Sequence, residues 1–273
     1  MKYLLLVPAI VFCSLFVVWP LGEIVVLSVT KTNFITSSFV GLDNYIALIS
    51  DRTFIQAMAN SLVYIALMVP LTVGSALGIA LMVMHQEKKW HDRVRIFLYV
   101  PVLASGIILA QVWRWIFHID GPVNALVQVF GFDAVQWFGT AQTAIPAIAF
   151  VVAVSSIGTS LIVILAGILR IDQSLFDAAR VDGCTPRQMK FHVVVPIIAP
   201  ELVVMSLLTA IAAPQIFETI YALAPYEHSA TMGWAIYVEA FQMSRHGSAA
   251  AMSFVLLVFM MSLAMLRRRV EAK

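Results

Sequence analysis

Six apolar segments, each long enough to cross a lipid bilayer, alternate with shorter polar loops along this chain. They are Tyr3–Ser28, Phe54–Met84, Ile96–Phe117, Ala141–Leu169, Val193–Leu223 and Ser248–Leu266. A helix needs about 20 apolar residues to cross the hydrocarbon core, and helices satisfy all their backbone groups within one segment. The chain is 61% hydrophobic and 12% charged, whereas soluble domains carry about 25% charged residues. We predict an all-α membrane protein, one domain over residues 1–273, with six transmembrane helices.

The first apolar segment follows Lys2 and could be confused with a secretory signal peptide. It continues through Pro20 to about Val29, and no small-residue cleavage site follows. The apolar part of a signal peptide is only about 7–15 residues long. We therefore expect an uncleaved first membrane helix.

The distribution of lysine and arginine predicts which loops face the cytoplasm, because short cytoplasmic loops are enriched in both residues. One side of the predicted membrane carries Lys2, Lys88, Lys89, Arg93, Arg95, Arg170, Arg180, Arg187, Lys190, Arg267, Arg268, Arg269 and Lys273, and the other carries Lys31, Arg52, Arg114 and Arg245. We therefore place both termini and the Asp177–Lys190 loop in the cytoplasm. The loops Thr30–Arg52, His118–Thr140 and Ala224–Gly247 are expected outside.

The polar insert between the fourth and fifth segments is about twenty residues long, more than a simple connection requires. Ser174–Val181 is predicted to be a short amphipathic helix, with Ser174 as its cap and Asp177 in its first turn. Ala178 and Ala179 leave little side-chain bulk, so that another protein can approach the backbone closely. The insert therefore predicts a docking surface.

A second helical piece is predicted after a sharp turn in the same insert. Gly183 permits the change of direction. Thr185 fits as the cap of the second piece and Pro186 as its first residue, and Arg187 belongs to this piece. Pro196 and Pro200 are expected to bend the chain as it returns to the membrane.

Several kinds of chemistry have no motif in this sequence. It contains no GxxxxGK[ST] phosphate loop, no HExxH, no CxxC and no GxSxG. The histidines are scattered and predict no metal site, and a net charge of +2 gives no signal for nucleic acid. We expect no cofactor in this chain and no catalytic residues, so any chemistry must come from a partner.

The spacing of the polar insert resembles a known family. Asp177-Ala178-Ala179, three residues, Gly183, nine residues and then Val193–Pro196 is similar to the cytoplasmic EAA loop of ABC-importer permeases, with Asp in place of the usual Glu. Phe39–Tyr45 looks like the FVGLxNY outer segment of carbohydrate-importer permeases, the maltose, trehalose and glycerol-3-phosphate group. The resemblance covers nearly the whole chain.

This resemblance implies a type I ABC importer permease fold with cytoplasmic coupling helices at about residues 171–192, in a bacterial inner membrane. It implies a second homologous permease, two ATPase subunits that bind ATP-Mg, and an extracytoplasmic substrate-binding protein as partners. The implied ATPase-coupling residues are Asp177, Ala178, Ala179, Gly183, Pro186 and Arg187.

A sugar needs hydrogen-bonding side chains and aromatic faces along its path, and the predicted crossings contain few. The candidates for the solute pathway are Gln111, Trp113, Gln215, Glu218, Asn60 and Tyr64. An ionisable group in a membrane usually faces a cavity, which favours Glu218, although an interfacial position or a pair with Arg114 is an alternative. For Asn60 and Tyr64 the alternative is packing between helices.

The resemblance implies a sugar such as a trehalose- or maltose-like disaccharide or oligosaccharide as the solute. An importer for glycerol-3-phosphate or a phosphodiester is an alternative, but a phosphate site favours cations facing the cavity, and only Arg114 is near. A membrane enzyme or a membrane sensor component is the alternative outside transport.

Overall fold

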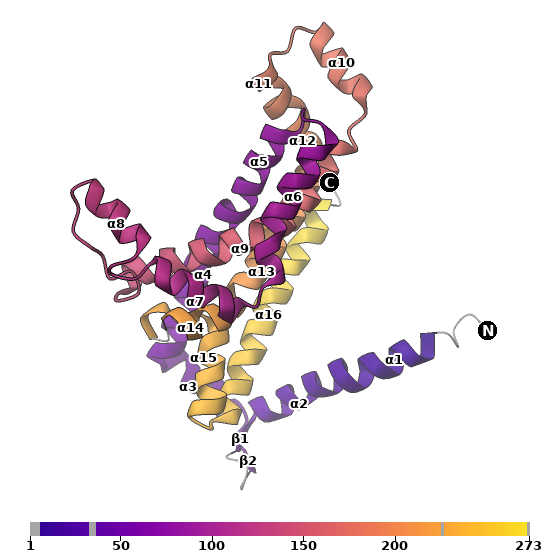
Figure 1. The fold of residues 1–273 in the computed structure, drawn as a ribbon. Coiled ribbons are helices and arrows are strands. Elements are labelled where there is room, and N and C mark those ends of the chain that lie inside the picture. The colour runs from indigo at the N-terminus through magenta and orange to yellow at the C-terminus, as the bar shows by residue number, and fades with distance from the viewer. Residues whose placement is uncertain (1–5, 33–36, 225–226, 272–273) are drawn as a thin grey trace.

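The computed structural model describes residues 6–32, 37–224 and 227–271, which are almost entirely helical (Figure 1). Within these residues, the strands are β1 (Thr30–Thr32) and β2 (Ser37–Phe39), which form an antiparallel hairpin with Lys31 opposite Ser38. The all-α prediction is therefore confirmed, apart from this short hairpin.

Four of the predicted crossings are continuous helical stretches of sufficient length and hydropathy. They are Val7–Ser28 (α1, Val7–Cys13; η2, Ser14–Val18; α2, Trp19–Ser28), Arg52–Val83 (α4, Arg52–Val69; η3, Pro70–Gly74; α5, Ser75–Val83), α9 (Ala141–Leu169) and His246–Met265 within α16 (His246–Glu271). The π-helical turns η2 and η3 do not interrupt these stretches. These four match the first, second, fourth and sixth predicted segments.

The third and fifth crossings are sharply bent. Helices α6 (Lys88–Leu103) and α7 (Gly106–Ile116) meet at 100°, where Ala104 and Ser105 have extended backbones. Pro186–Ile197 and Ala199–Gln215 meet at 68°. The prolines predicted to bend the fifth crossing flank this break at Ile198, but the break in the third segment was not predicted. Six crossings result when each bent pair is counted as one.

The remaining helices are short and form the loops and the pieces of the fifth crossing. They are α3 (Asp43–Ser50), α8 (Pro122–Val129), α10 (Gln173–Val181), α11 (Pro186–Gln188), η4 (Met189–Val194), α12 (Val195–Ile197), α13 (Ala199–Ala212), η5 (Ala213–Gln215), α14 (Glu218–Leu223), η6 (Glu227–Ser229), α15 (Met232–Tyr237) and η7 (Val238–Gln242).

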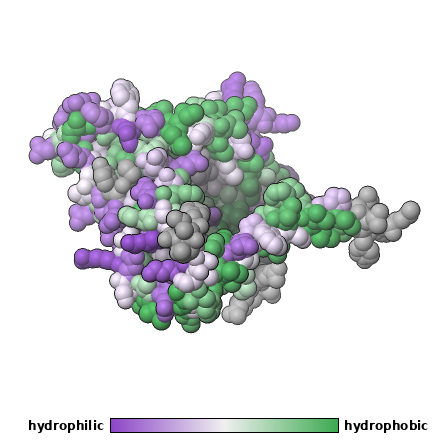
Figure 2. Space-filling view, turned by 90° about the horizontal axis from the view of Figure 1, so that it is seen from below, coloured by the Kyte–Doolittle hydropathy of each residue, from purple (hydrophilic) through white to green (hydrophobic). Residues whose placement is uncertain are grey.

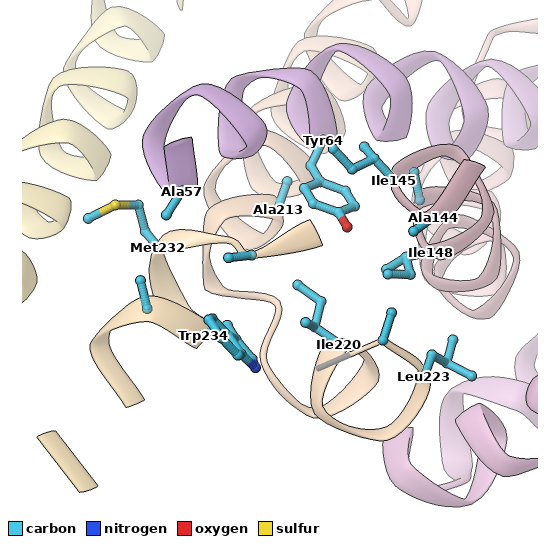
Figure 3. Packing of buried hydrophobic residues seen from close by; sticks show 14 of the residues in the cluster. Ala57, Tyr64, Ala144, Ile145, Ile148, Ala213, Ile220, Leu223, Met232 and Trp234 are labelled. Carbon is cyan, nitrogen blue, oxygen red and sulfur yellow. The ribbon is translucent and has the colours of Figure 1, made fainter. Parts of the chain in front are cut away.

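Helix α9 is the centre of the bundle and contributes to both of its hydrophobic cores. One core gathers Tyr64, Ile148 and Met232 (Figure 3), and the other gathers Ile164 and Val194 nearer to α10. The crossing of α9 and α6 is very close, because a Cβ on Gly158 would lie 2.2 Å from the carbonyl oxygen of Leu98. Only a residue without a side chain fits there.

Helices α1 and α2 project from the bundle as an arm, and α2 meets the rest of the chain at α16 (Figure 1). The side chains of the arm are exposed and apolar almost throughout, as the green surface in Figure 2 shows. An exposed apolar surface of this size is stable against lipid or against another apolar protein surface.

Helices α10 and α11 lie at the opposite end of the molecule from the β1–β2 hairpin and α15 (Figure 1). The loop predicted to face the cytoplasm and two of the loops predicted to face outside are therefore separated by the length of the bundle. This arrangement is what the predicted topology requires.

Candidate functional site

The cap of helix α10 lies two residues before the predicted one. Asp172 is its N-cap, and the carboxylate oxygen Oδ1 accepts a hydrogen bond of 2.8 Å from the backbone N–H of Ser174. This bond, and a weaker one from the Ser174 side chain, hold the pKa of Asp172 below its usual 3.8. The predicted cap at Ser174 is wrong because Asp172, with its extended backbone, supplies the acceptor first. As a result, Asp177 lies beyond the first turn.

The two faces of α10 differ as an amphipathic helix should. Phe176 and Ala179 are buried against the bundle, whereas Asp177, Ala178 and Arg180 are exposed. Arg180 donates a hydrogen bond of 2.7 Å from Nη1 to Oδ1 of Asp177. Of the two alanines predicted for the docking surface, Ala179 turns its side chain inward, because it shares the apolar face of Phe176 three residues earlier. The side chain of Ala178 faces outward.

The turn after α10 requires the glycine that the sequence places there. Gly183 has φ +77°, in the left-handed region. Its N–H donates to the carbonyl of Arg180 at 3.1 Å, and the N–H of Cys184 donates to the carbonyl of Ala179 at 3.0 Å. These two bonds make a Schellman motif, in which the residue after the cap is left-handed and is usually glycine. The predicted turn is confirmed.

The second helical piece is capped as predicted. The hydroxyl of Thr185 accepts from the backbone N–H of Gln188, and the side chain of Gln188 accepts from the backbone N–H of Thr185, which together form a capping box. Pro186 is the first residue of α11, and the side chain of Arg187 is exposed. The 171–192 loop is therefore two short helices held at a fixed angle by a cap, a Schellman turn and a capping box.

A cavity of about 240 Å³ lies at the break in the third crossing, where α9 and the start of α14 also line it. Pro101, Ala104 and Gly106 line it from the bend between α6 and α7, and its hydroxyl groups come from Ser155, Ser156, Thr159 and Thr219. Ser155 and Ser156 donate to carbonyls one turn earlier in α9, so their oxygens keep lone pairs for another donor.

Sequence reasoning missed the hydroxyl residues of this cavity. The signal available was a cluster of Ser and Thr in the middle of the apolar α9, together with the Ala104-Ser105-Gly106 break in the third segment.

Glu218 lies beside this cavity, next to the lining residue Thr219. Its Oε2 is so close to Gly106 that a Cβ on that glycine would be 2.7 Å away. The carboxylate is exposed and forms none of the ion pairs found among the described residues. Arg114, the predicted alternative partner, instead donates to the backbone carbonyl of Ala222. Glu218 therefore presents an acceptor without a cation at the edge of the cavity.

The other predicted pathway residues do not line this cavity. Gln111 is exposed, and Trp113 packs against the rings of Phe117 and Phe150. Gln215 is exposed, but its Nε2 donates to the carbonyl of Ile211 at 2.7 Å within its own helix.

Asn60 and Tyr64 have a structural role. Asn60 donates to the carbonyls of His228 and Ala230, and the hydroxyl of Tyr64 donates to the carbonyl of Ser229 at 3.1 Å. Tyr64 is fully buried, close to Ala213 and Ile220 (Figure 3). The structure favours the packing alternative for both residues, because their polar groups are used to fix the chain at 228–230. Among the described residues, no group of His, Cys, Asp or Glu could hold a metal ion.

Over most of its length the chain is similar to membrane components of known transport systems. A family model described as "Binding-protein-dependent transport system inner membrane component" matches residues 45–273. The chain is 30% identical to the probable ABC transporter permease protein YurN of Bacillus subtilis, over 98% of this chain and 94% of that protein. It is 28% identical to the sulfoquinovosyl glycerol transport system permease protein SmoG of Agrobacterium fabrum, over 94% of this chain and 86% of that protein.

A solved structure agrees with the fold. It is a bacterial ABC transporter involved in the import of the acidic polysaccharide alginate, and one of its chains superposes with a TM-score of 0.82 at 25% identity. The match covers 98% of this chain and 95% of that chain. The overall arrangement of the helices is therefore one that a solved transporter also has.

Proposed function

Because this chain belongs to the family of inner membrane components of binding-protein-dependent transport systems, we propose that it forms half of the translocation pathway of a bacterial ABC importer for a neutral sugar. Similar permeases carry names that specify lactose and multiple sugars as solutes. Another is named for sulfoquinovosyl glycerol, which carries a sulfonate, so the preference for a neutral sugar rests on the cavity of this chain. The observation that carries the proposal for this chain is the cavity at the break in the third crossing, with its hydroxyl groups and the adjacent carboxylate of Glu218.

The chemistry of the cavity favours a neutral solute with many hydroxyl groups. Sugar hydroxyls donate to carboxylates and both donate to and accept from the Ser and Thr side chains. Lys, Arg and His do not occur among the residues that line the cavity, and the guanidinium of Arg114 is used by the backbone of α14. An anionic solute such as glycerol-3-phosphate would meet the charge of Glu218 without a compensating cation.

The 171–192 loop is the proposed contact with an ATPase subunit. Its outward face carries Asp177, Ala178 and Arg187, while Phe176 fastens its inner face to the bundle. With this loop and both termini in the cytoplasm, the hairpin end faces an extracytoplasmic binding protein. The complete importer contains a second homologous permease and two ATPase subunits, which bind ATP-Mg and supply the hydrolysis.

The mechanism follows from this arrangement. The loaded binding protein docks at the hairpin end, and ATP binding closes the two ATPase subunits. The ATPase subunits move α10 and α11 as they close. This displacement changes the angles between α6, α7 and α9, which surround the cavity. The cavity then opens alternately to the two sides of the membrane, and the solute is released inward after hydrolysis.

The test is uptake by proteoliposomes that contain the whole importer, for a panel of neutral and anionic sugars. Glu218→Gln should raise KM for the transported neutral sugar by roughly tenfold, the effect of losing a hydrogen bond to a charged group. It should also reduce the discrimination against anionic sugars. Asn60→Ala is the control, because it should lower the amount of folded permease without changing KM.

Two results would contradict the proposal. Unchanged KM and unchanged selectivity in Glu218→Gln across the panel would remove the carboxylate from the pathway. A complex that binds its partners but transports no solute at all would favour a sensor component.

A further inference from the structure

An ion pair joins the two ends of the segment that contains the 171–192 loop. Arg170 directly follows the last residue of α9, and Glu201 lies in the first turn of α13. Nη2 of Arg170 donates to Oε1 of Glu201 at 2.8 Å. The segment between these two residues, from α10 through α12, is therefore a loop whose two ends are joined by this ion pair.

The surroundings of this pair are more favourable than those of an ordinary surface pair. The side chain of Glu201 is only 19% exposed, whereas that of Arg170 is 78% exposed. The cation stands at the C-terminal end of α9 and the carboxylate at the N-terminal end of α13, so both helix dipoles favour the charges. A carboxylate that is mostly removed from water also needs its partner, since losing the partner leaves a buried charge uncompensated.

The chain makes room for this contact with a glycine. A Cβ on Gly167 would lie 3.1 Å from Cγ, Cδ and Oε1 of Glu201. Glycine is among the poorest helix formers, and Gly167 sits in the last turn of the long helix α9. The side chain of Glu201 therefore packs directly against α9 at Gly167, and a larger residue at position 167 would displace it.

We infer that Arg170 and Glu201 are positioning residues that make the coupling segment move as one piece with α9 and α13. The fifth crossing is bent by 68° at Ile198, just before Glu201. A force on α10 can be absorbed by changing this bend or can be passed to both crossings together. The ion pair opposes the first outcome because it holds the start of α13 against the end of α9. The inference rests on the proposed function, in which an ATPase moves this loop.

The experiment measures the number of solute molecules transported per ATP hydrolysed by the reconstituted importer. Arg170→Glu and Glu201→Arg should each lower this ratio by roughly threefold to tenfold, which lies within the range of coupling changes in such networks. Arg170→Lys should keep the ratio, because a single hydrogen bond joins the pair and an ammonium can replace it. Gly167→Ala should lower it less, since the Glu201 side chain needs to move by only a few tenths of an ångström.

The double variant with exchanged charges should recover part of the ratio. Recovery is incomplete because the exchanged charges oppose both helix dipoles. The matched control is the exposed pair Lys89–Glu87 in the other proposed cytoplasmic loop, where the Nζ–Oε2 distance is 2.6 Å. Lys89→Glu should leave the ratio unchanged, which separates the effect of this pair from a general change in loop charge.

The ratio is a useful readout because a smaller amount of folded protein lowers transport and hydrolysis equally. An unchanged ratio in both single variants, or no recovery in the double variant, overturns the inference while the importer still works. If the wild-type complex shows no ATP-dependent uptake, the proposed function fails instead.

Discussion

Replacement of Gly183 tests whether the angle between α10 and α11 is needed for coupling. The residue has φ +77°, and a Cβ added there would meet no atom within 4 Å. The cost of a larger side chain is therefore conformational and not a clash. The left-handed region costs a residue with a Cβ about 1–2 kcal/mol, and a β-branched residue such as valine more. Gly183→Val should thus disfavour the Schellman turn by roughly 5- to 30-fold or more.

The assay titrates ATPase subunits onto the reconstituted permease complex and follows ATP hydrolysis stimulated by the loaded binding protein. Gly183→Val should weaken the apparent affinity for the ATPase by at least this factor and should abolish uptake at limiting ATPase, while insertion into the membrane stays normal. Gly183→Asn is the matched variant, because asparagine tolerates the left-handed region better than other residues with a Cβ. Wild-type affinity and uptake in Gly183→Val would refute the reasoning, as would an equal loss in Gly183→Asn.

Gly158→Ala should lower the thermal stability of the complex in detergent by roughly 5 °C or more, because its Cβ would meet the backbone of α6 at 2.2 Å, while Gly78→Ala, which meets nothing, should not. An unchanged melting temperature would show that α6 and α9 can separate without cost. Asp172 has a lowered pKa, so its cap is fully present above pH 3.8 and is lost as the pH falls through the lower folded value. Limited proteolysis of the 171–192 loop should therefore be faster in acid than at neutral pH. At neutral pH it should be faster in Asp172→Ala than in the wild type, but not in Asp172→Asn. Equal cleavage of the wild type and both variants at neutral pH would exclude the cap.

The local features of the 171–192 loop could be predicted because each depends on neighbouring residues. The Thr185 cap, Pro186 at the start of α11 and the Gly183 turn all follow from the conformational preferences of single residues. The observed cap of α10 differs from the predicted one because Asp172 and Ser174 are both good caps, and residue type alone does not favour either. Ala179 could have been assigned to the buried face from its spacing to Phe176.

The candidate solute site could be predicted only in part. Counting apolar residues finds six crossings, but it does not show that Ala104 and Ser105 become extended. The local signal for that break is Pro101 followed by the Ser105-Gly106 pair, since sharp breaks occur at proline and at Gly/Ser pairs. The roles of Asn60 and Tyr64 depend on residues more than 160 positions later in the chain. One sequence contains no record of such contacts, so a buried polar residue that fixes a loop looks the same as one that binds a solute.

Helix α9 offers the most direct physical connection between the proposed ATPase contact and the cavity. Its last turns share a hydrophobic core with Phe176 and Ala179 of α10, and Ser156 faces the cavity further along the same helix.

From Ile168 to Ser156 the helix spans twelve residues, or about 18 Å at 1.5 Å per residue, without a proline or a break. The fifth crossing also runs between the 171–192 loop and the level of the cavity, but it is bent by 68° on the way. A force on the loop can change this bend, whereas the continuous helix α9 transmits the force. Gly158 also brings α9 into close contact with α6, before the break that lines the cavity. We expect a displacement of α9 along its axis to be passed to α6 and to change the angle between α6 and α7. We therefore expect the 100° break, and not the ends of the crossings, to be the part of this chain that opens and closes around the solute.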